Sequence, residues 1–185
     1  PWALYLPSPA VSDPGGAARL LLALVWRGGL AFTAEVLDRP AGDDRALRPN
    51  QLLAVSLPNS PLTSPQQRRL LDACARHLLT SLGLRSLAPD DPQFIGLYLG
   101  DRRTRDGAYH QGTTWAWLIG PFVQAHWRVY QNRAQARAFL EPFRHHLSDA
   151  GLGSISEIAD GDAPFTPRGC PWQAWSVAEV LRVWK

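Results

Sequence analysis

The chain has 185 residues, of which 45% are hydrophobic, and a formal net charge of +3. This length and composition predict one globular domain that buries most of its apolar surface. Its arginines are scattered along the sequence, which argues against a nucleic-acid-binding protein, because such proteins concentrate positive charge on one face. The longest apolar run, residues 17–26, contains Arg19 and is shorter than the roughly 20 residues that a membrane-spanning helix needs.

Cysteine usage and the first residue indicate the setting of the chain. Cys74 and Cys170 have neither metal-binding spacing nor a disulfide framework, and no positively charged leader precedes the apolar run. We therefore expect reduced thiols in a soluble cytoplasmic protein. The sequence begins with Pro1 and contains no methionine, so we expect it to be a piece of a longer polypeptide.

The first half of the chain predicts helices separated by loops and one short strand. Residues 1–16 are rich in proline and glycine and indicate an extended lead-in. The clearest helix has Ser64 as its N-cap, Pro65 at its first position and a leucine stripe at helical spacing. In order, we expect a helix over 14–26, a strand over 30–36, a charged loop over 39–49, a short helix over 50–57 and the long helix up to Gly83.

The second half alternates a long connection with further helices. Residues 84–112 show little periodicity, and connections of this length are usually functional in a compact domain. The helix over 113–131 contains Pro121, which should either kink it or force an unusual first turn. Two more helices are expected over 133–147, with a break near Pro142, and over about 171–183, with Trp172, Trp175, Val177, Ala178 and Leu181 on the buried side.

Helix pairs joined alternately by short and long connections predict an all-α fold. The arrangement is typical of an α/α toroid, whose long loops gather at one end to form a site. The helices expected in this chain are too few to close such a ring. We therefore expect an incomplete toroid.

A polar loop over residues 153–162 supplies the first candidate site. It carries three carboxylates, of which Glu157 lies between apolar neighbours, and Arg168 and paired tryptophans follow it. Aromatic faces stack on sugar rings, while carboxylates and guanidinium groups bind hydroxyls. Glu157 is therefore the candidate for one half of a glycosidase acid/base pair. The alternative is that these acids only cap helices.

Two further clusters carry polar and aromatic groups. Arg48-Pro-Asn50-Gln51 lies at a loop-to-helix junction and could bind sugar hydroxyls, or Asn50 could cap the helix while Arg48 pairs with an aspartate. The second cluster lies before a predicted helix, where backbone N–H groups are free, unless its rings belong to the core and Thr113 is the cap. It comprises Asp106, Tyr109, His110, Gln111 and Trp115.

Other kinds of site are not indicated. His145 and His146 point in different directions on a helix, so they make a poor metal site and are expected to face solvent. No nucleophile elbow, cysteine–histidine motif or phosphate-binding glycine loop is present. Carboxylate chemistry without a metal or cofactor is what remains.

Together these clusters resemble the C-terminal amylo-alpha-1,6-glucosidase region of glycogen debranching enzymes. The matching stretches keep the family order from Leu47 to the end of the chain. They are residues 47–51, 86–89, 105–112 with Trp115 and Trp117, 153–157, 160–162, and 167–170 with 173–179. Residues 1–40 match poorly and are expected to form a lead-in and first helix, while residues 41–185 would form the C-terminal portion of the glucosidase barrel.

The resemblance implies an (α/α)6 barrel that removes α-1,6-linked branch glucose during glycogen breakdown, with inversion. It implies that Glu157 is the general base and that an aspartate of a missing upstream segment is the general acid. The isolated chain should then be inactive without that N-terminal half. The substrate would be glycogen or a branched α-glucan oligosaccharide, bound by Arg48, Asn50, Gln51, Asp106, Tyr109, His110, Gln111, Trp115 and Arg168.

Two other functions stay open at this point. One is another (α/α)6-barrel glycosidase, similar to a glucoamylase or a trehalase. The other is a carbohydrate-binding remnant that keeps the fold without catalysis.

Overall fold

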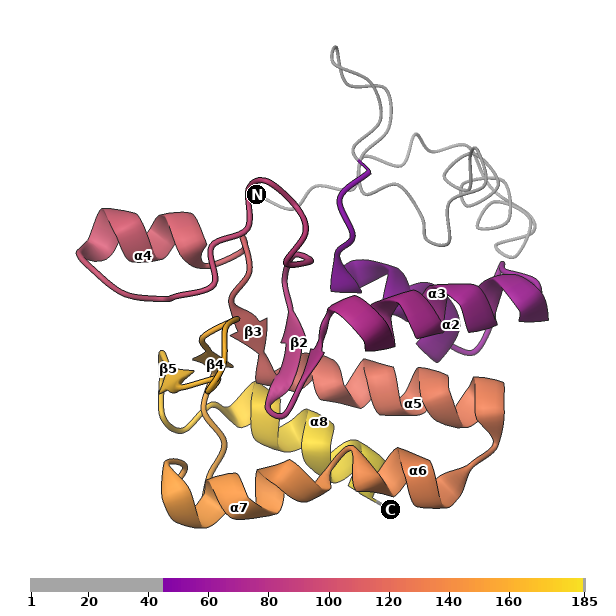
Figure 1. Cartoon of the computed structure of the whole chain (residues 1–185). Coiled ribbons are helices and arrows are strands. Elements are labelled where there is room, and N and C mark those ends of the chain that lie inside the picture. The colour runs from indigo at the N-terminus through magenta and orange to yellow at the C-terminus, as the bar shows by residue number, and fades with distance from the viewer. Residues whose placement is uncertain (1–44, 185) are drawn as a thin grey trace, which may run out of the picture.

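The computed structural model describes residues 45–184. The lead-in, the helix over 14–26 and the strand over 30–36 expected from the sequence lie outside these residues. Half of the described part is helical, and a small five-stranded antiparallel sheet lies at one end of the helices (Figure 1). Within residues 45–184, no helix has the length and apolar character needed to cross a membrane.

The helices differ in length from one turn to four. They are the 3-10 helices η1 (Pro49–Leu52) and η2 (Ala116–Leu118), and α2 (Leu53–Ser56), α3 (Ser64–His77), α4 (Arg102–Ala108), α5 (Ile119–Tyr130), α6 (Arg133–Ala138), α7 (Glu141–Asp149) and α8 (Ala174–Trp184). The five strands are paired in chain order. They are β1 (Leu79–Thr80), β2 (Gly83–Arg85), β3 (Thr114–Trp115), β4 (Ile158–Ala159) and β5 (Pro167–Arg168).

The sheet corrects the expectation of purely helical structure. The long helix α3 ends at His77 instead of Gly83, and the following residues form the β1–β2 hairpin. Gly83 has a φ of +134°, and a Cβ there would collide with the Trp115 carbonyl group of β3. The hairpin therefore depends on a glycine for the close approach of β3. Strands of two or three residues are too short to show an alternating pattern in the sequence.

Helix ends follow the local sequence closely. Thr63, rather than Ser64, is the N-cap of α3, and it forms a capping box with Gln66. Pro121 lies in the first turn of α5, directly after the 3-10 turn η2, so the proline does not kink the helix. Pro142 lies in the first turn of α7, after the break from α6 that the sequence predicted.

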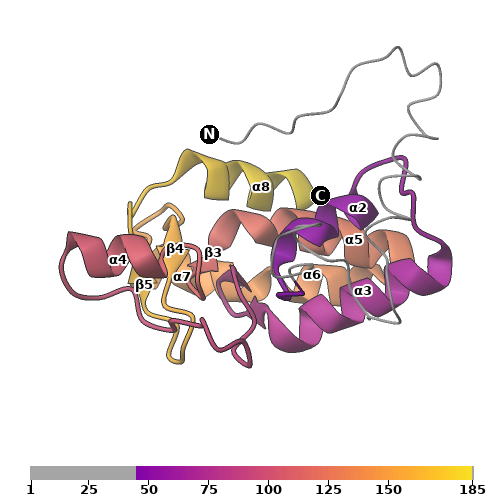
Figure 2. The ribbon, with the colours of Figure 1, turned by 90° about the horizontal axis from the view of Figure 1, so that it is seen from above.

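Helix α5 is the centre of the apolar core. It contacts α2, α3, α6 and α8, and α3 and α8 lie on opposite sides of it (Figure 2). Phe122 of α5 is fully buried, as are Leu52, Leu70 and Leu71 from the elements before it. The core thus lies between helices, and the sheet closes one end of it. The expectation that these helices form part of an (α/α)6 toroid remains a prediction.

The buried side of α8 differs from the prediction. Ser176 and Val180 face the core, whereas Trp172, Trp175 and Leu181 are 64%, 50% and 61% exposed. The helix lies close to α5 because Gly120 has no side chain, and a Cβ there would collide with Glu179 of α8. The tryptophans alone did not predict this orientation, because it depends on the contact with Gly120, which lies on another helix.

Candidate active site

The sheet brings two of the predicted clusters to neighbouring strands. Strand β3 contains Trp115 of the aromatic cluster, and β4 begins directly after Glu157. The two strands pair through Trp115 and Ile158. Strand β5 carries Arg168 and pairs with β4 on the other side. Residues some 50 positions apart in the sequence therefore meet at one edge of the molecule (Figure 1).

Glu157 is half-buried and held at both its backbone and its carboxylate. Its N–H donates to the Cys170 carbonyl at 2.9 Å, and its carbonyl accepts from the Ala116 N–H at 3.3 Å. The carboxylate Oε1 accepts from the Tyr109 hydroxyl, and Oε2 accepts from the Cys170 N–H at 3.0 Å. Gly169 has a φ of +68°, and a Cβ there would lie 2.5 Å from Oε2. A glycine is therefore required at position 169 for the Cys170 N–H to donate to the carboxylate.

Tyr109 connects Glu157 to the aromatic cluster. Burial, reinforced by the hydrogen bond to Glu157, raises the pKa of the Tyr109 hydroxyl, so it remains a donor at neutral pH. The Tyr109 carbonyl accepts from the Trp115 Nε1 at 3.0 Å. The Tyr109 ring lies edge-on to Trp115 at 4.6 Å and close to Tyr98 at 5.7 Å. These contacts place the Trp115 and Tyr98 rings next to the tyrosine that binds the carboxylate.

His110 and Trp115 form a flat stacked pair. Their ring centroids are 5.2 Å apart and the planes differ by 1°. Partial burial and the neighbouring Arg48 lower the pKa of His110, which favours the neutral imidazole. A neutral ring can both donate and accept a hydrogen bond, as sugar hydroxyls require.

Arg48 binds the loop that carries His110 and Gln111. Its Nη1 donates to the His110 carbonyl at 2.7 Å and to the Ser86 carbonyl at 3.1 Å, while Nη2 donates to Gln111 Oε1 at 2.8 Å. Gln51 is 7% exposed and donates to the Arg48 carbonyl at 2.7 Å. Asn50, which is exposed, is the second residue of the same short helical segment. Arg48, itself bound by Gln51, thus stabilises the loop that carries His110 and Gln111.

Arg168 and Asp160 form a buried ion pair. Asp160 is 2% exposed, and Arg168 donates to its carboxylate through Nη2 at 2.9 Å and Nε at 3.2 Å. The Tyr98 N–H also donates to Asp160, at 2.8 Å. Asp160 therefore connects Arg168 to the segment around Tyr98. Sequence reasoning missed Tyr98, because it lies in a long irregular connection without a pattern.

Asp106 lies on an exposed helix, and the two histidines of α7 differ in burial. Asp106 is on the exposed face of α4 and lies 3.6 Å from Arg102. His145 is exposed, but His146 is only 4% exposed, so the expectation that both face solvent is wrong for His146. Among residues 45–184, no group of three or more His, Cys, Asp or Glu side chains is arranged to hold a metal ion.

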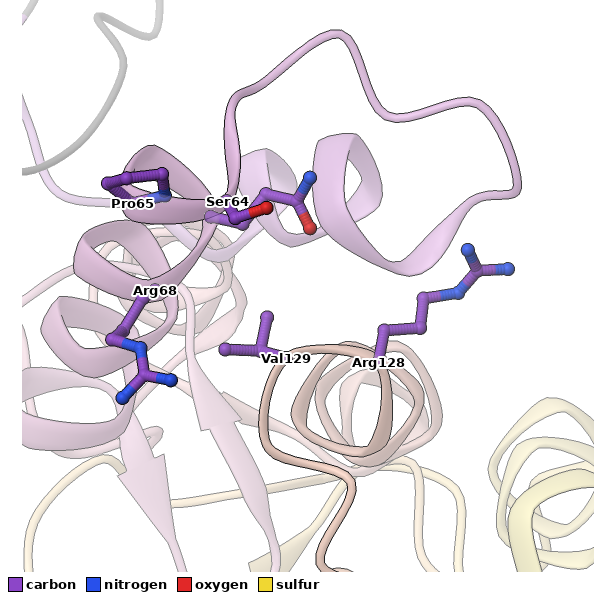
Figure 3. A pocket seen from close by; sticks show the side chains of 6 residues that line it. Ser64, Pro65, Arg68, Arg128 and Val129 are labelled. Atoms are coloured by element: carbon purple, nitrogen blue, oxygen red, sulfur yellow. The ribbon is translucent and has the colours of Figure 1, made fainter.

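Two cavities lie away from these residues. One, of about 410 Å³, lies between the first turn of α3 and the end of α5, where Val129 separates two arginines (Figure 3). It is lined by Ser64, Pro65, Gln67, Arg68, Arg128 and Val129. The other, of about 290 Å³, lies between α5, α6 and α8. Neither includes a residue of the candidate site.

A half-buried carboxylate with fixed donors beside stacked aromatic rings is the kind of site that carbohydrate-active enzymes use. Comparison with known proteins gives the same class. The family model described as amylo-alpha-1,6-glucosidase matches residues 26–182, and the chain belongs to this glycosidase family.

A curated relative supports the assignment. The chain is 25% identical over 162 residues to the glycogen debranching enzyme of Saccharomyces cerevisiae. The match covers 75% of this chain and 10% of the yeast protein. The chain thus spans a small part of the length of this relative.

Proposed function

We propose that this chain forms the C-terminal part of a debranching glucosidase that releases α-1,6-linked branch glucose from glycogen-like α-glucans. In this proposal the reaction inverts the anomeric carbon, and Glu157 is the general base. The observation that carries the proposal is the position of the Glu157 carboxylate at the edge of the sheet, where it accepts hydrogen bonds from the Tyr109 hydroxyl and the Cys170 N–H. Family membership supports the same reaction class.

The hydrogen bonds suit a carboxylate that must be held in one direction. A donor on each oxygen fixes the orientation of the group. Each carboxylate oxygen keeps a second lone-pair direction, so one of them can take a proton from water. The water would attack the anomeric carbon from the face opposite the leaving oxygen.

The general acid would come from a segment outside the described residues. Neither Asp160 nor Asp106 suits this role. Asp160 is ion-paired with Arg168 and accepts from the Tyr98 N–H, and Asp106 lies on an exposed helix next to Arg102. Inverting pairs leave roughly 6.5–9.5 Å between carboxyl groups for the water. We propose an upstream aspartate at that separation, with the N-terminal half of the same enzyme as the partner that supplies it.

The aromatic cluster would hold the sugar. The stacked His110–Trp115 pair and Gln111 offer a flat surface with directional hydrogen bonds, and Arg48 keeps their loop in place. Asn50, Gln51, Asp106 and Arg168 remain predicted contacts or supports of this surface. Cys74 and Cys170 are both free thiols, which agrees with the cytoplasmic location that we expect.

The test is a Glu157→Gln substitution in the complete enzyme that contains this chain. Loss of the base should lower kcat for glucose release from a branched limit dextrin by about 10²- to 10⁴-fold. Affinity for the oligosaccharide should change little, because the amide keeps the shape of the side chain. The matched control is Glu141→Gln on the exposed face of α7, which pairs only with Arg144 in its own helix turn.

Four outcomes would contradict the proposal. Unchanged turnover in Glu157→Gln would remove the residue from the base role. Equal or faster hydrolysis of linear maltooligosaccharides would favour a glucoamylase-like enzyme, and a retained anomeric configuration would exclude inversion. Oligosaccharide binding without any hydrolysis, even with the upstream half present, would favour a binding remnant.

A further inference from the structure

The loop that carries Glu157 is bound by a buried histidine from a different element. His146 lies in the last turn of α7 and is 4% exposed. Its Nε2 accepts a hydrogen bond from the Ser156 N–H at 3.1 Å. Ser156 is 5% exposed and directly precedes Glu157. The imidazole therefore binds the backbone one residue away from the proposed base.

The other backbone bonds of this segment connect it to a different part of the chain. The Glu157 N–H donates to the Cys170 carbonyl, and the Ile155 carbonyl accepts from the Gln173 N–H at 2.9 Å. Both partners lie in the segment that leads into α8, and the Glu157 carbonyl also accepts from the Ala116 N–H of η2. The His146 contact joins the loop to α7 instead, an element that makes none of these bonds.

The turn after α7 folds back over the imidazole. The His146 carbonyl accepts from the N–H groups of Ala150 and Gly151 at 3.1 and 2.7 Å. A Cβ at Gly151 would lie 3.0 Å from the His146 Cδ2 and would collide with the Ser154 carbonyl. The ring is thus enclosed by the turn that leads into the Glu157 loop, and its orientation is fixed by that turn.

The contact requires a neutral ring with its proton on Nδ1. An imidazolium would present a second N–H to the Ser156 N–H and could not accept from it. Burial lowers the pKa of His146, with a weaker opposite effect from Asp149 on the same helix. A leucine of similar size could fill the space, but it could not accept the hydrogen bond.

We propose that His146 is a positioning residue, whose Nε2 fixes the Ser156 backbone and thereby the direction of the Glu157 carboxylate. The inference rests on the proposed role of Glu157 as the base. His146 itself does not touch the substrate in this proposal. Its effect is exerted through the loop.

The experiment compares three variants in the complete enzyme. His146→Leu removes the acceptor and keeps the volume, and His146→Gln places an amide oxygen near the former Nε2. His145→Leu is the matched control, since His145 is the exposed neighbour on the same helix. Steady-state kinetics on a branched oligosaccharide are combined with hydrogen exchange, measured by mass spectrometry on the peptide that contains residues 155–157.

We expect a small misalignment of the base to appear in kcat rather than in KM. His146→Leu should lower kcat by about 10- to 100-fold while KM changes by less than about threefold. It should also accelerate exchange in residues 155–157. His146→Gln should restore most of kcat and of the protection, and His145→Leu should match the wild type in both measurements.

Specific results would overturn the inference. A His146→Leu enzyme with wild-type kcat would do so, as would a His146→Gln enzyme that loses as much as the leucine variant, because packing alone would then explain the effect. If the leucine variant is insoluble, His146→Asn, whose shorter side chain cannot reach Ser156, replaces it and is interpreted in the same way.

The exchange measurement separates this inference from the proposed function. If Glu157→Gln stays active, the base assignment fails, yet faster exchange in His146→Leu would still show that His146 holds the loop. Unchanged exchange in His146→Leu would overturn the positioning role whatever Glu157 does.

Discussion

The helical end and the sheet end of this molecule are stabilised by different kinds of contact. At the helical end, α5 packs against α2, α3 and α8 through apolar side chains, with Phe122 and Leu70 fully buried. At the sheet end, the strands have only two or three residues. Their arrangement depends on polar contacts over long sequence distances, such as Arg48 to the His110 carbonyl and the Tyr98 N–H to Asp160.

The difference indicates how substitutions at the two ends should behave. Apolar burial is non-directional and contributes to the free energy of unfolding roughly in proportion to area. Hydrogen bonds contribute less net stability, but each one fixes the direction of a group. We therefore expect changes at the helical end to affect stability, and changes at the sheet end to affect catalysis first.

The largest stability effect is expected for Phe122→Ala in the core. Removal of this fully buried ring should lower the free energy of unfolding by about 3–5 kcal/mol. Chemical denaturation measures the loss, and kcat at a temperature where the variant is folded should stay near the wild-type value. The control Phe122→Leu should lose much less. A kcat that falls as steeply as stability would contradict the division between the two ends.

Arg168→Met tests whether the sheet end also has a stability centre. Its partner Asp160 has a side chain only 3% exposed, and a buried carboxylate without its cation typically costs about 3 kcal/mol or more. The control is Arg182→Met, which breaks the more exposed pair with Glu179 and should cost at most about 1 kcal/mol. Equal losses in the two variants, measured by denaturation, would show that the buried pair has no special weight.

Two tyrosine–carboxylate hydrogen bonds, one at each end, allow a direct comparison. The Tyr109 hydroxyl donates to Glu157 at the sheet end, and the Tyr130 hydroxyl donates to Asp72 at the helical end. Tyr109→Phe should lower kcat by about tenfold, roughly 1.4 kcal/mol, because the carboxylate loses one of the two donors that fix its direction. Tyr130→Phe should leave kcat unchanged. Similar kinetics for the two variants would remove Tyr109 from the site.

The smallest effect is expected from acid. Burial lowers the pKa values of His126 in α5 and of His146, so both rings stay neutral in the folded protein below the ordinary pKa of about 6.5. The unfolded chain binds protons first as the pH falls, so stability should decrease from about pH 6.5 downward, by at most about 1.4 kcal/mol per pH unit for each histidine. Denaturation at pH 7 and 5.5 measures this, and His126→Phe should reduce the slope. A rise in stability over this range would contradict both assignments.

The sequence predicted the helices well where local rules apply. The end of the short helix over 50–57 and the break near Pro142 were predicted from prolines and spacing, and the structure confirms them. The motifs that indicated the family lie in short local runs, and the family match confirms that resemblance. Such features depend on residues within a few positions of one another.

The sequence failed where the partner is distant. The β1–β2 hairpin was read as the end of a helix, because its geometry depends on β3 passing close to Gly83. The ion pair between Arg168 and Asp160 was not predicted, because Asp160 could not be distinguished from two neighbouring acids in the same loop. His146 looked like a surface residue, because the turn that encloses it follows α7 rather than lying within it.

By itself, then, the sequence determined the chemical character of each cluster, the family of the chain and most of the helical segments. It missed α4 in the predicted connection and placed the start of α5 at 113 instead of Ile119. Only the tertiary structure decided which polar groups meet, which face of α8 is buried, and which side chains hold the Glu157 carboxylate. The physical reason is the range of the forces. Helix propensity, capping and turn geometry act between near neighbours, whereas a directional hydrogen bond or a close backbone contact requires that two remote segments already lie in the correct place.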